Sequence, residues 1–236
     1  MKWFFVLLLL WNCETRHDPN KKNLLIAYLA INYQAENCRT YSGEANPVFT
    51  GSYYANYITD QTQYNKIILG DSTMDIACKW TNYISTGTAC FPVSGNTLCD
   101  MQEQLYALNS KNPSFVMVST SGGNDLLRKI SNENIIKSGK SLIDKVTEKF
   151  PNAIKLIILV HPTRVDYANT NRKITNAEIK SYAESKGWKV ENPDSVFTIE
   201  SDGKASQNDL IDSIHPTQTT GFKIKNKIYS DFGLLY

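Results

Sequence analysis

Four side chains of types that cooperate in acyl transfer occur in three short polar motifs of this 236-residue sequence. The motifs are a Gly-Asp-Ser ending at Ser72, a Gly-Gly-Asn ending at Asn124, and Asp212-x-x-His215 near the C-terminus. A serine hydroxyl attacks a carbonyl carbon when a histidine accepts its proton, and a nearby carboxylate fixes the tautomer of that histidine. An asparagine amide can donate to the oxyanion that forms. Together the motifs predict nucleophilic acyl transfer.

Each motif also has a structural interpretation when it is taken alone. Ser72 could cap the helix that follows it, and Asn124 could belong to an ordinary strand-to-helix turn. His215 could be a solvated residue of a surface turn. The order of the motifs and the elements that precede them must therefore support any assignment of function.

Short apolar runs bounded by polar or turn residues predict four buried strands of a parallel sheet. The runs are Lys66–Leu69, Ala89–Val93, Phe115–Val118 and Ile154–Val160. Helical patterns are Thr97–Leu108, 131–151 with Ser131 or Asn132 as its cap, Asn176–Ser185, and Thr220–Ser230. Strands that alternate with helices predict an α/β fold, a three-layer α/β/α sandwich with a mostly parallel central sheet and right-handed crossovers.

The predicted strand ends explain how motifs far apart in the sequence could meet. In open α/β sheets, reactive groups gather at the carboxyl ends of the strands. Ser72 follows the first predicted strand and Asn124 the third, so we expect both at one edge, with Ser72 in the first turn of a helix where unpaired N–H groups favour a negative oxygen. His161 follows the fourth strand and points to the same edge, either lining a substrate cleft or simply ending the strand before Pro162.

Joined in this order, the three motifs resemble the GDSL family of hydrolases, also called SGNH hydrolases, over Lys66 to Phe232. The resemblance implies a flavodoxin-like fold, with Ser72 as nucleophile, His215 as general base and later acid, and Asp212 as the residue that orients the imidazole. It implies no metal and no organic cofactor, because the family carries out acyl transfer with side chains alone. Thr73 stands where the name-giving motif has Leu, a position expected to serve packing rather than chemistry.

The same resemblance implies the composition of the oxyanion hole. Its donors would be the backbone N–H of Ser72, the backbone N–H of Gly95 and the side chain of Asn124. Two further aspartates inside the motifs are predicted to hold their loops through side-chain to backbone hydrogen bonds, namely Asp71 and Asp125.

The charge balance argues against a polyanionic partner. There are 25 Lys and Arg residues against 23 Asp and Glu residues, with no long run of one sign. Neither nucleic acid nor an anionic bilayer is therefore an expected electrostatic partner, and we expect a small-molecule, glycan or lipid ester.

The N-terminus predicts export. Nine apolar residues, Trp3 to Trp11, follow one Lys, which is too short for a membrane span but suits a signal peptide; a short buried helix is the alternative. Cys13 directly follows this region and resembles a bacterial lipoprotein lipidation site, although the residues before it are larger than usual. We therefore expect residues 1–22 to be a signal and tether, residues 23–236 to be one domain, and the protein to lie in the cell envelope or be secreted.

The remaining cysteines, Cys38, Cys78, Cys90 and Cys99, are even in number, which in an exported chain predicts two disulfides. A bond between Cys90 and Cys99 is favoured because it closes a short loop. A zinc site is not expected, since no Cys-x-x-Cys spacing occurs and the three His residues are scattered.

These observations lead to one main functional hypothesis and two rivals. The main one is a serine esterase of the cell envelope that cleaves lipid, short-chain or O-acetyl sugar esters through an acyl-enzyme on Ser72. The alternative is a non-catalytic envelope-binding lipoprotein on the same fold, which uses the Tyr-rich segment around Tyr53, Tyr54 and Tyr57. A third is a flavin-binding α/β protein with a phosphate cradle after its first strand.

Overall fold

Five parallel strands form the centre of the part of the chain that the computed structural model describes, residues 64–108 and 112–236. In spatial order they are β2 (Thr88–Cys90), β1 (Lys66–Gly70), β3 (Phe115–Ser119), β4 (Ile154–Ile158) and β5 (Lys189–Glu191). The strand order 2-1-3-4-5 is that of flavodoxin-like doubly wound sheets. The predicted parallel α/β sandwich is confirmed.

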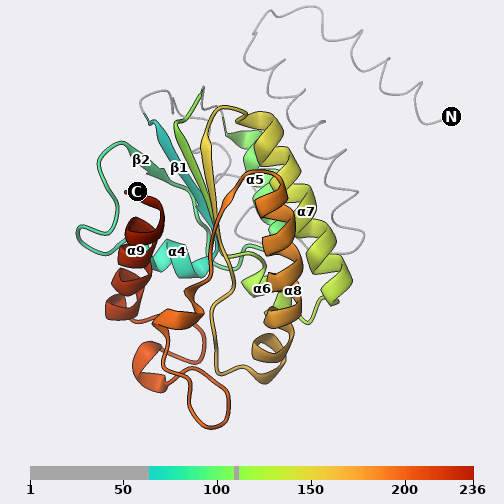
Figure 1. The fold of residues 1–236 in the computed structure, drawn as a ribbon, viewed down its shortest axis with the longest axis vertical. Coiled ribbons are helices and arrows are strands. Elements are labelled where there is room, and N and C mark those ends of the chain that lie inside the picture. Colours follow the sequence, from blue (N-terminus) through green and yellow to red (C-terminus); the bar gives the residue numbers. More distant parts are fainter. Residues whose placement is uncertain (1–63, 109–111) are drawn as a thin grey trace, which may run out of the picture.

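Helices cover both faces of the sheet (Figure 1). One layer consists of α5 (Leu98–Ala107), α6 (Gly123–Leu127), α7 (Asn132–Lys149) and α8 (Asp166–Ser185). The other consists of α4 (Ser72–Ala77) and α9 (Gln218–Phe232), with the 3-10 turns η2 (Pro193–Val196) and η3 (Gln207–Asp209) between β5 and α9. None of the helices in the described ranges is long and apolar enough to cross a membrane.

The strand side chains alternate between two separate cores. Ile67 and Leu69 of β1 pack beneath the α5, α7 and α8 layer, whereas Ile68 packs beneath α4 and α9. All three are completely buried. Burial on both faces explains why the strand sequences are continuous apolar runs rather than alternating ones.

Two elements differ strongly from the sequence prediction, whereas the ends of the others shift by at most three residues. Helix α8 begins at Asp166 rather than at Asn176, because its buried face carries Arg172, Thr175 and Asn176 in its first half, and polar residues hide the helical periodicity. Strand β5 is only three residues long and ends in a buried glutamate, Glu191, so no apolar run marks it.

The predicted bond between Cys90 and Cys99 is wrong, because Cys90 pairs with Cys78 at a Cα–Cα distance of 6.5 Å. Cys78 ends α4, and both partners pack in the core on the α4 and α9 side of the sheet. Cys99 belongs to α5, which lies in the opposite layer. The prediction was wrong because it considered only the distance in sequence. The central sheet separates the core that contains Cys90 from the helical layer that contains Cys99.

Several predictions fall outside the described residues. They concern the signal and tether at 1–22, the lipidation of Cys13, the pairing of Cys38 and the Tyr-rich segment at 53–57.

Candidate active site

Ser72 lies at the junction between β1 and α4, as the first residue of the helix. Gly70 is required two residues before it, because an added Cβ would collide with the backbone carbonyl of Ser119 on the neighbouring strand. Asp71 is the N-cap of α4, and its Oδ1 accepts a hydrogen bond from the Thr73 N–H at 3.0 Å. This capped turn holds the Ser72 hydroxyl at the carboxyl edge of the sheet.

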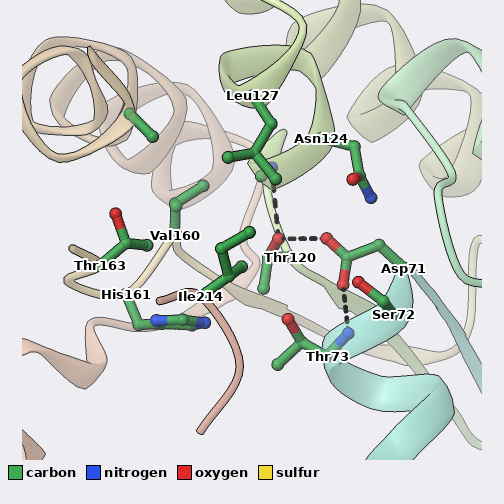
Figure 2. Close-up of a pocket in the computed structure, with 12 residues that line it drawn as sticks. Asp71, Ser72, Thr73, Thr120, Asn124, Leu127, Val160, His161, Thr163 and Ile214 are labelled. Carbon is green, nitrogen blue, oxygen red and sulfur yellow. Dashed lines mark hydrogen bonds between the residues drawn. The ribbon is translucent and has the colours of Figure 1, made fainter. Parts of the chain in front are cut away.

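A buried hydrogen bond fixes Asp71 to the loop after β3. Thr120 donates from Oγ1 to Asp71 Oδ2 at 2.8 Å and accepts from the Gly123 N–H at 3.3 Å (Figure 2). Burial raises the pKa of Asp71, although the hydrogen bonds from Thr120 and Thr73 oppose that shift. Asp71 therefore has the structural role expected of it, and Thr120 is a partner that the sequence alone did not reveal.

The structure brings His215 into hydrogen-bond contact with both of its predicted partners. The Nε2 atom of His215 lies 2.8 Å from Ser72 Oγ, and its Nδ1 lies 2.8 Å from Asp212 Oδ2. A carboxylate only accepts, so Nδ1 carries the hydrogen and Nε2 presents a lone pair to the serine hydroxyl. Residues 143 positions apart in the sequence thus form a continuous Asp–His–Ser chain.

Asp212 reaches His215 from a closed loop rather than from the helical turn that the spacing suggested. The other carboxylate oxygen, Oδ1, accepts from the backbone N–H groups of Ile214 at 2.6 Å and His215 at 2.8 Å. The loop is closed by the Ile211 N–H, which donates to the His215 carbonyl at 2.8 Å. The His215 imidazole is therefore held by a turn whose backbone N–H groups bind the Asp212 carboxylate, and not by the predicted helical turn.

Hydrogen bonds keep Asp212 charged. Its partial burial raises the pKa, but the bonds from the His215 ring and from the two backbone N–H groups outweigh burial, and the pKa of Asp212 lies below its ordinary value. An ionised carboxylate at this position stabilises a positive charge on His215.

Asn124 is the second residue of α6, at the same edge of the sheet. Its Nδ2 donates to the Asn96 carbonyl at 3.0 Å, which orients the amide and leaves a second N–H on the same nitrogen. The loop of Gly95 is tied to this region, since Asn96 Nδ2 donates to the Gly70 carbonyl at 3.1 Å and Arg128 Nη2 to the Gly95 carbonyl at 3.0 Å. Gly95, with a φ of 88°, is not among the residues that line the cavity beside Ser72.

A small cavity adjoins the nucleophile. Figure 2 shows Ser72 and Asn124 on one side of it and His161 and Thr163 on the other. Its volume is about 20 Å³, which is room for little more than one water molecule. His161 therefore lines the cavity, one of the two positions the sequence allowed for it. The described residues contain no cluster of three His, Cys, Asp or Glu side chains that could hold a metal ion.

Solved structures with a similar fold include three hydrolases from bacteria. A GDSL-like lipase from Bacteroides thetaiotaomicron is 15% identical, with a TM-score of 0.62 over 75% of this chain and 95% of that one. A member of the lipolytic G-D-S-L family from Veillonella parvula is 17% identical, with a TM-score of 0.57 over 72% and 98%. The chain has the GDSL/SGNH hydrolase fold.

An acetyl-xylooligosaccharide esterase from Geobacillus Stearmophilus shares the SGNH fold with 13% identity and a TM-score of 0.56, over 75% of this chain and 98% of its own. No protein-family model matches the sequence, and the comparison with curated proteins gives no match. At these identities the structural similarity shows the SGNH fold, and the contacts of Ser72, Asp212 and His215 carry the functional argument.

Proposed function

We propose that the protein is a serine esterase that cleaves carboxylic esters through an acyl-enzyme on Ser72. The observation that carries this proposal is the pair of 2.8 Å contacts that His215 makes with Ser72 and Asp212. In addition, the similar structures include proteins described as a GDSL-like lipase and an acetyl-xylooligosaccharide esterase.

The reaction begins when Ser72 Oγ attacks the ester carbonyl carbon. Its proton moves to His215 Nε2, and the ionised Asp212 stabilises the resulting imidazolium. The carbonyl oxygen becomes an oxyanion, which accepts hydrogen bonds from the Ser72 backbone N–H and the second N–H of Asn124, with Gly95 as the third proposed donor.

The intermediate then collapses, the C–O bond to the alcohol breaks, and His215 passes its proton to the leaving oxygen. Water repeats the sequence on the acyl-enzyme, with His215 again as base, and releases the acid and free Ser72. No step needs a metal or an organic cofactor, since each proton and electron pair has a protein group or water to receive it.

Hydrolysis of p-nitrophenyl acetate tests the proposal. We expect Ser72→Ala and His215→Ala to lose nearly all turnover while they keep the melting temperature of the wild type. Ser185→Ala, an exposed serine at the end of α8, is the matched control and should retain full activity. Equal activity of the wild type and Ser72→Ala would refute the assignment.

We also propose that the protein is exported and that Cys13 anchors it to a bilayer of the cell envelope. The supporting feature is the apolar run Trp3 to Trp11 directly before this cysteine. Cell fractionation and mass spectrometry of the mature N-terminus test this. Lipid on Cys13 supports the anchor, whereas an intact N-terminus in the cytoplasm contradicts export.

A further inference from the structure

His161 is a buried imidazole that the hydrolytic steps do not use. It follows β4, is 3% exposed, and stacks on Phe197 with ring centroids 5.2 Å apart and planes 11° from parallel. Its Nδ1 lies 2.9 Å from the Pro162 carbonyl oxygen. The stacking and the hydrogen bond together fix the ring in one orientation.

This orientation leaves a lone pair on Nε2. A carbonyl only accepts, so Nδ1 carries the hydrogen and Nε2 is the acceptor of the neutral ring. Burial lowers the pKa of His161 to about 4; nearby Arg172 and His215 lower it further, while the bond to Pro162 and the charge of Asp194 oppose the shift. No group within residues 64–108 and 112–236 hydrogen-bonds to Nε2.

The ring projects into the cavity that contains Ser72. Figure 2 shows it extending from the end of β4 toward Thr73, across the cavity from Asn124. Thr73, Thr120 and His161 also line a second cavity, so these three residues border both spaces. The His161 ring therefore borders both cavities. A molecule bound there can reach its Nε2 acceptor.

We expect the leaving alcohol on the side of the cavity where His161 lies. The oxyanion is expected beside Asn124, and the leaving oxygen must face His215, which protonates it. Ile214, the residue before His215, lines the cavity together with His161, and a positive charge on His215 lowers the pKa of His161. A group attached to the alcohol next to the ester oxygen would thus meet His161.

We propose that His161 Nε2 accepts a hydrogen bond from a free hydroxyl on the carbon next to the esterified carbon, so that the site prefers esters of diols, polyols or sugars. This inference rests on the proposed esterase function. An ester without that hydroxyl leaves a buried acceptor unpaired, which is the situation in which a site discriminates between similar substrates.

The test compares 2-hydroxyethyl acetate with 2-methoxyethyl acetate, with each rate corrected for alkaline hydrolysis of the same ester. For the wild type we expect kcat/KM to favour the hydroxyl ester by about fivefold. His161→Phe keeps a ring to stack on Phe197 but removes the acceptor, and the ratio should fall to about one. His161→Gln restores an acceptor oxygen and should recover part of the preference.

The outcomes separate this inference from the proposed function. A wild type that hydrolyses both esters equally, or a His161→Phe variant that keeps the preference, overturns the role of His161 while the esterase stands. A preference seen only when the hydroxyl is moved to the acyl side, with ethyl glycolate against ethyl methoxyacetate, also overturns it. Absence of Ser72-dependent turnover of either ester contradicts the proposed function itself.

Discussion

Asp71 and Asp212 both act next to Ser72, but their surroundings are opposite. Asp71 is 2% exposed and bonded to neutral donors, whereas the Asp212 side chain is 52% exposed and bonded to the imidazole of His215. Accordingly, the pKa of Asp71 is raised by burial, and that of Asp212 is lowered by its hydrogen bonds despite partial burial.

The difference separates two halves of the site. The half built from the β1–α4 and β3–α6 junctions is buried and positions Ser72 and Asn124, whereas residues 210–216 form a more exposed loop that presents His215. Changes in the first half should therefore mainly alter stability, and changes in the loop should mainly alter chemistry. Ser72 and Asn124 are the exceptions, since they are the proposed nucleophile and a proposed oxyanion donor.

Apart from Ser72 and His215 themselves, the largest effect is expected at Asp212. Asp212→Asn keeps an oxygen for the Ile214 and His215 N–H groups but no longer favours the tautomer with Nδ1–H, so kcat should fall about 10⁴-fold. The free energy of unfolding should fall by only about 1 kcal/mol, since Asn keeps an acceptor oxygen but loses the charge on the hydrogen-bonded carboxylate. Steady-state hydrolysis and urea unfolding measure both. Asp202→Asn is the exposed control, and near-normal turnover of Asp212→Asn would remove Asp212 from the mechanism.

Asn124→Ala should have the next largest effect. Loss of one oxyanion donor typically lowers kcat about 10² to 10³-fold with little change in KM. The measurement is kcat and KM for p-nitrophenyl acetate, with the exposed Asn208→Ala as control. A loss of less than tenfold would show that the amide does not face the developing charge.

The buried half should make stability depend on pH. Asp125 accepts the Leu98 N–H through Oδ2, its Oδ1 has no hydrogen-bond partner among the described residues, and burial raises its pKa to about 7. The folded state thus holds the proton more tightly than the unfolded state, where the pKa is about 4. Its stabilising contribution is complete below about pH 4 and is lost as the pH rises through about 7, a change of about 4 kcal/mol.

Urea unfolding at pH 5 and pH 8 measures this loss. Asp125→Asn should flatten the decrease but not abolish it, because burial also raises the pKa of Glu191 to about 7. Glu191→Gln isolates that second contribution. An unchanged pH dependence in Asp125→Asn would contradict the role of Asp125.

The smallest effect is expected at the hydrogen bond from Thr120 to Asp71. Thr120→Val removes the donor to Asp71 and should cost about 1 kcal/mol, and Asp71→Ala, which also removes the helix cap, about 2 kcal/mol. Thermal unfolding measures both. The folded variants should still react with an active-site phosphonate. Loss of that reactivity without loss of stability would show that the hydrogen bond from Thr120 to Asp71 supports the reaction rather than the fold.

The sequence predicted that the candidate site residues meet at one edge of the sheet better than it predicted some of the elements around them. Ser72 and Asn124 were located through the strands that precede them, whose apolar runs are plain in the sequence, and His215 through its spacing from Asp212. Strand β5 and the first half of α8 did not follow, because buried polar groups replace apolar ones there. Asn176, for example, satisfies both the N–H of Val160, at 3.1 Å, and its carbonyl, at 2.8 Å.

The sequence also did not predict the contacts between residues on neighbouring strands and layers. The pairing of Cys78 with Cys90 depends on which layer each residue faces, and the bond from Thr120 to Asp71 depends on the close approach of β1 and β3. The loop that presents Asp212 was mistaken for a helical turn because a spacing of three residues suits both geometries. None of these features is encoded in local spacing.

Peptide mapping after reaction with a fluorophosphonate tests most directly the central claim that Ser72 and His215 act as nucleophile and base. We expect one phosphonyl group per molecule, located on Ser72, and a strongly reduced labelling rate in folded His215→Ala. A label on a different serine, or an unlabelled wild type with native structure, would contradict the account.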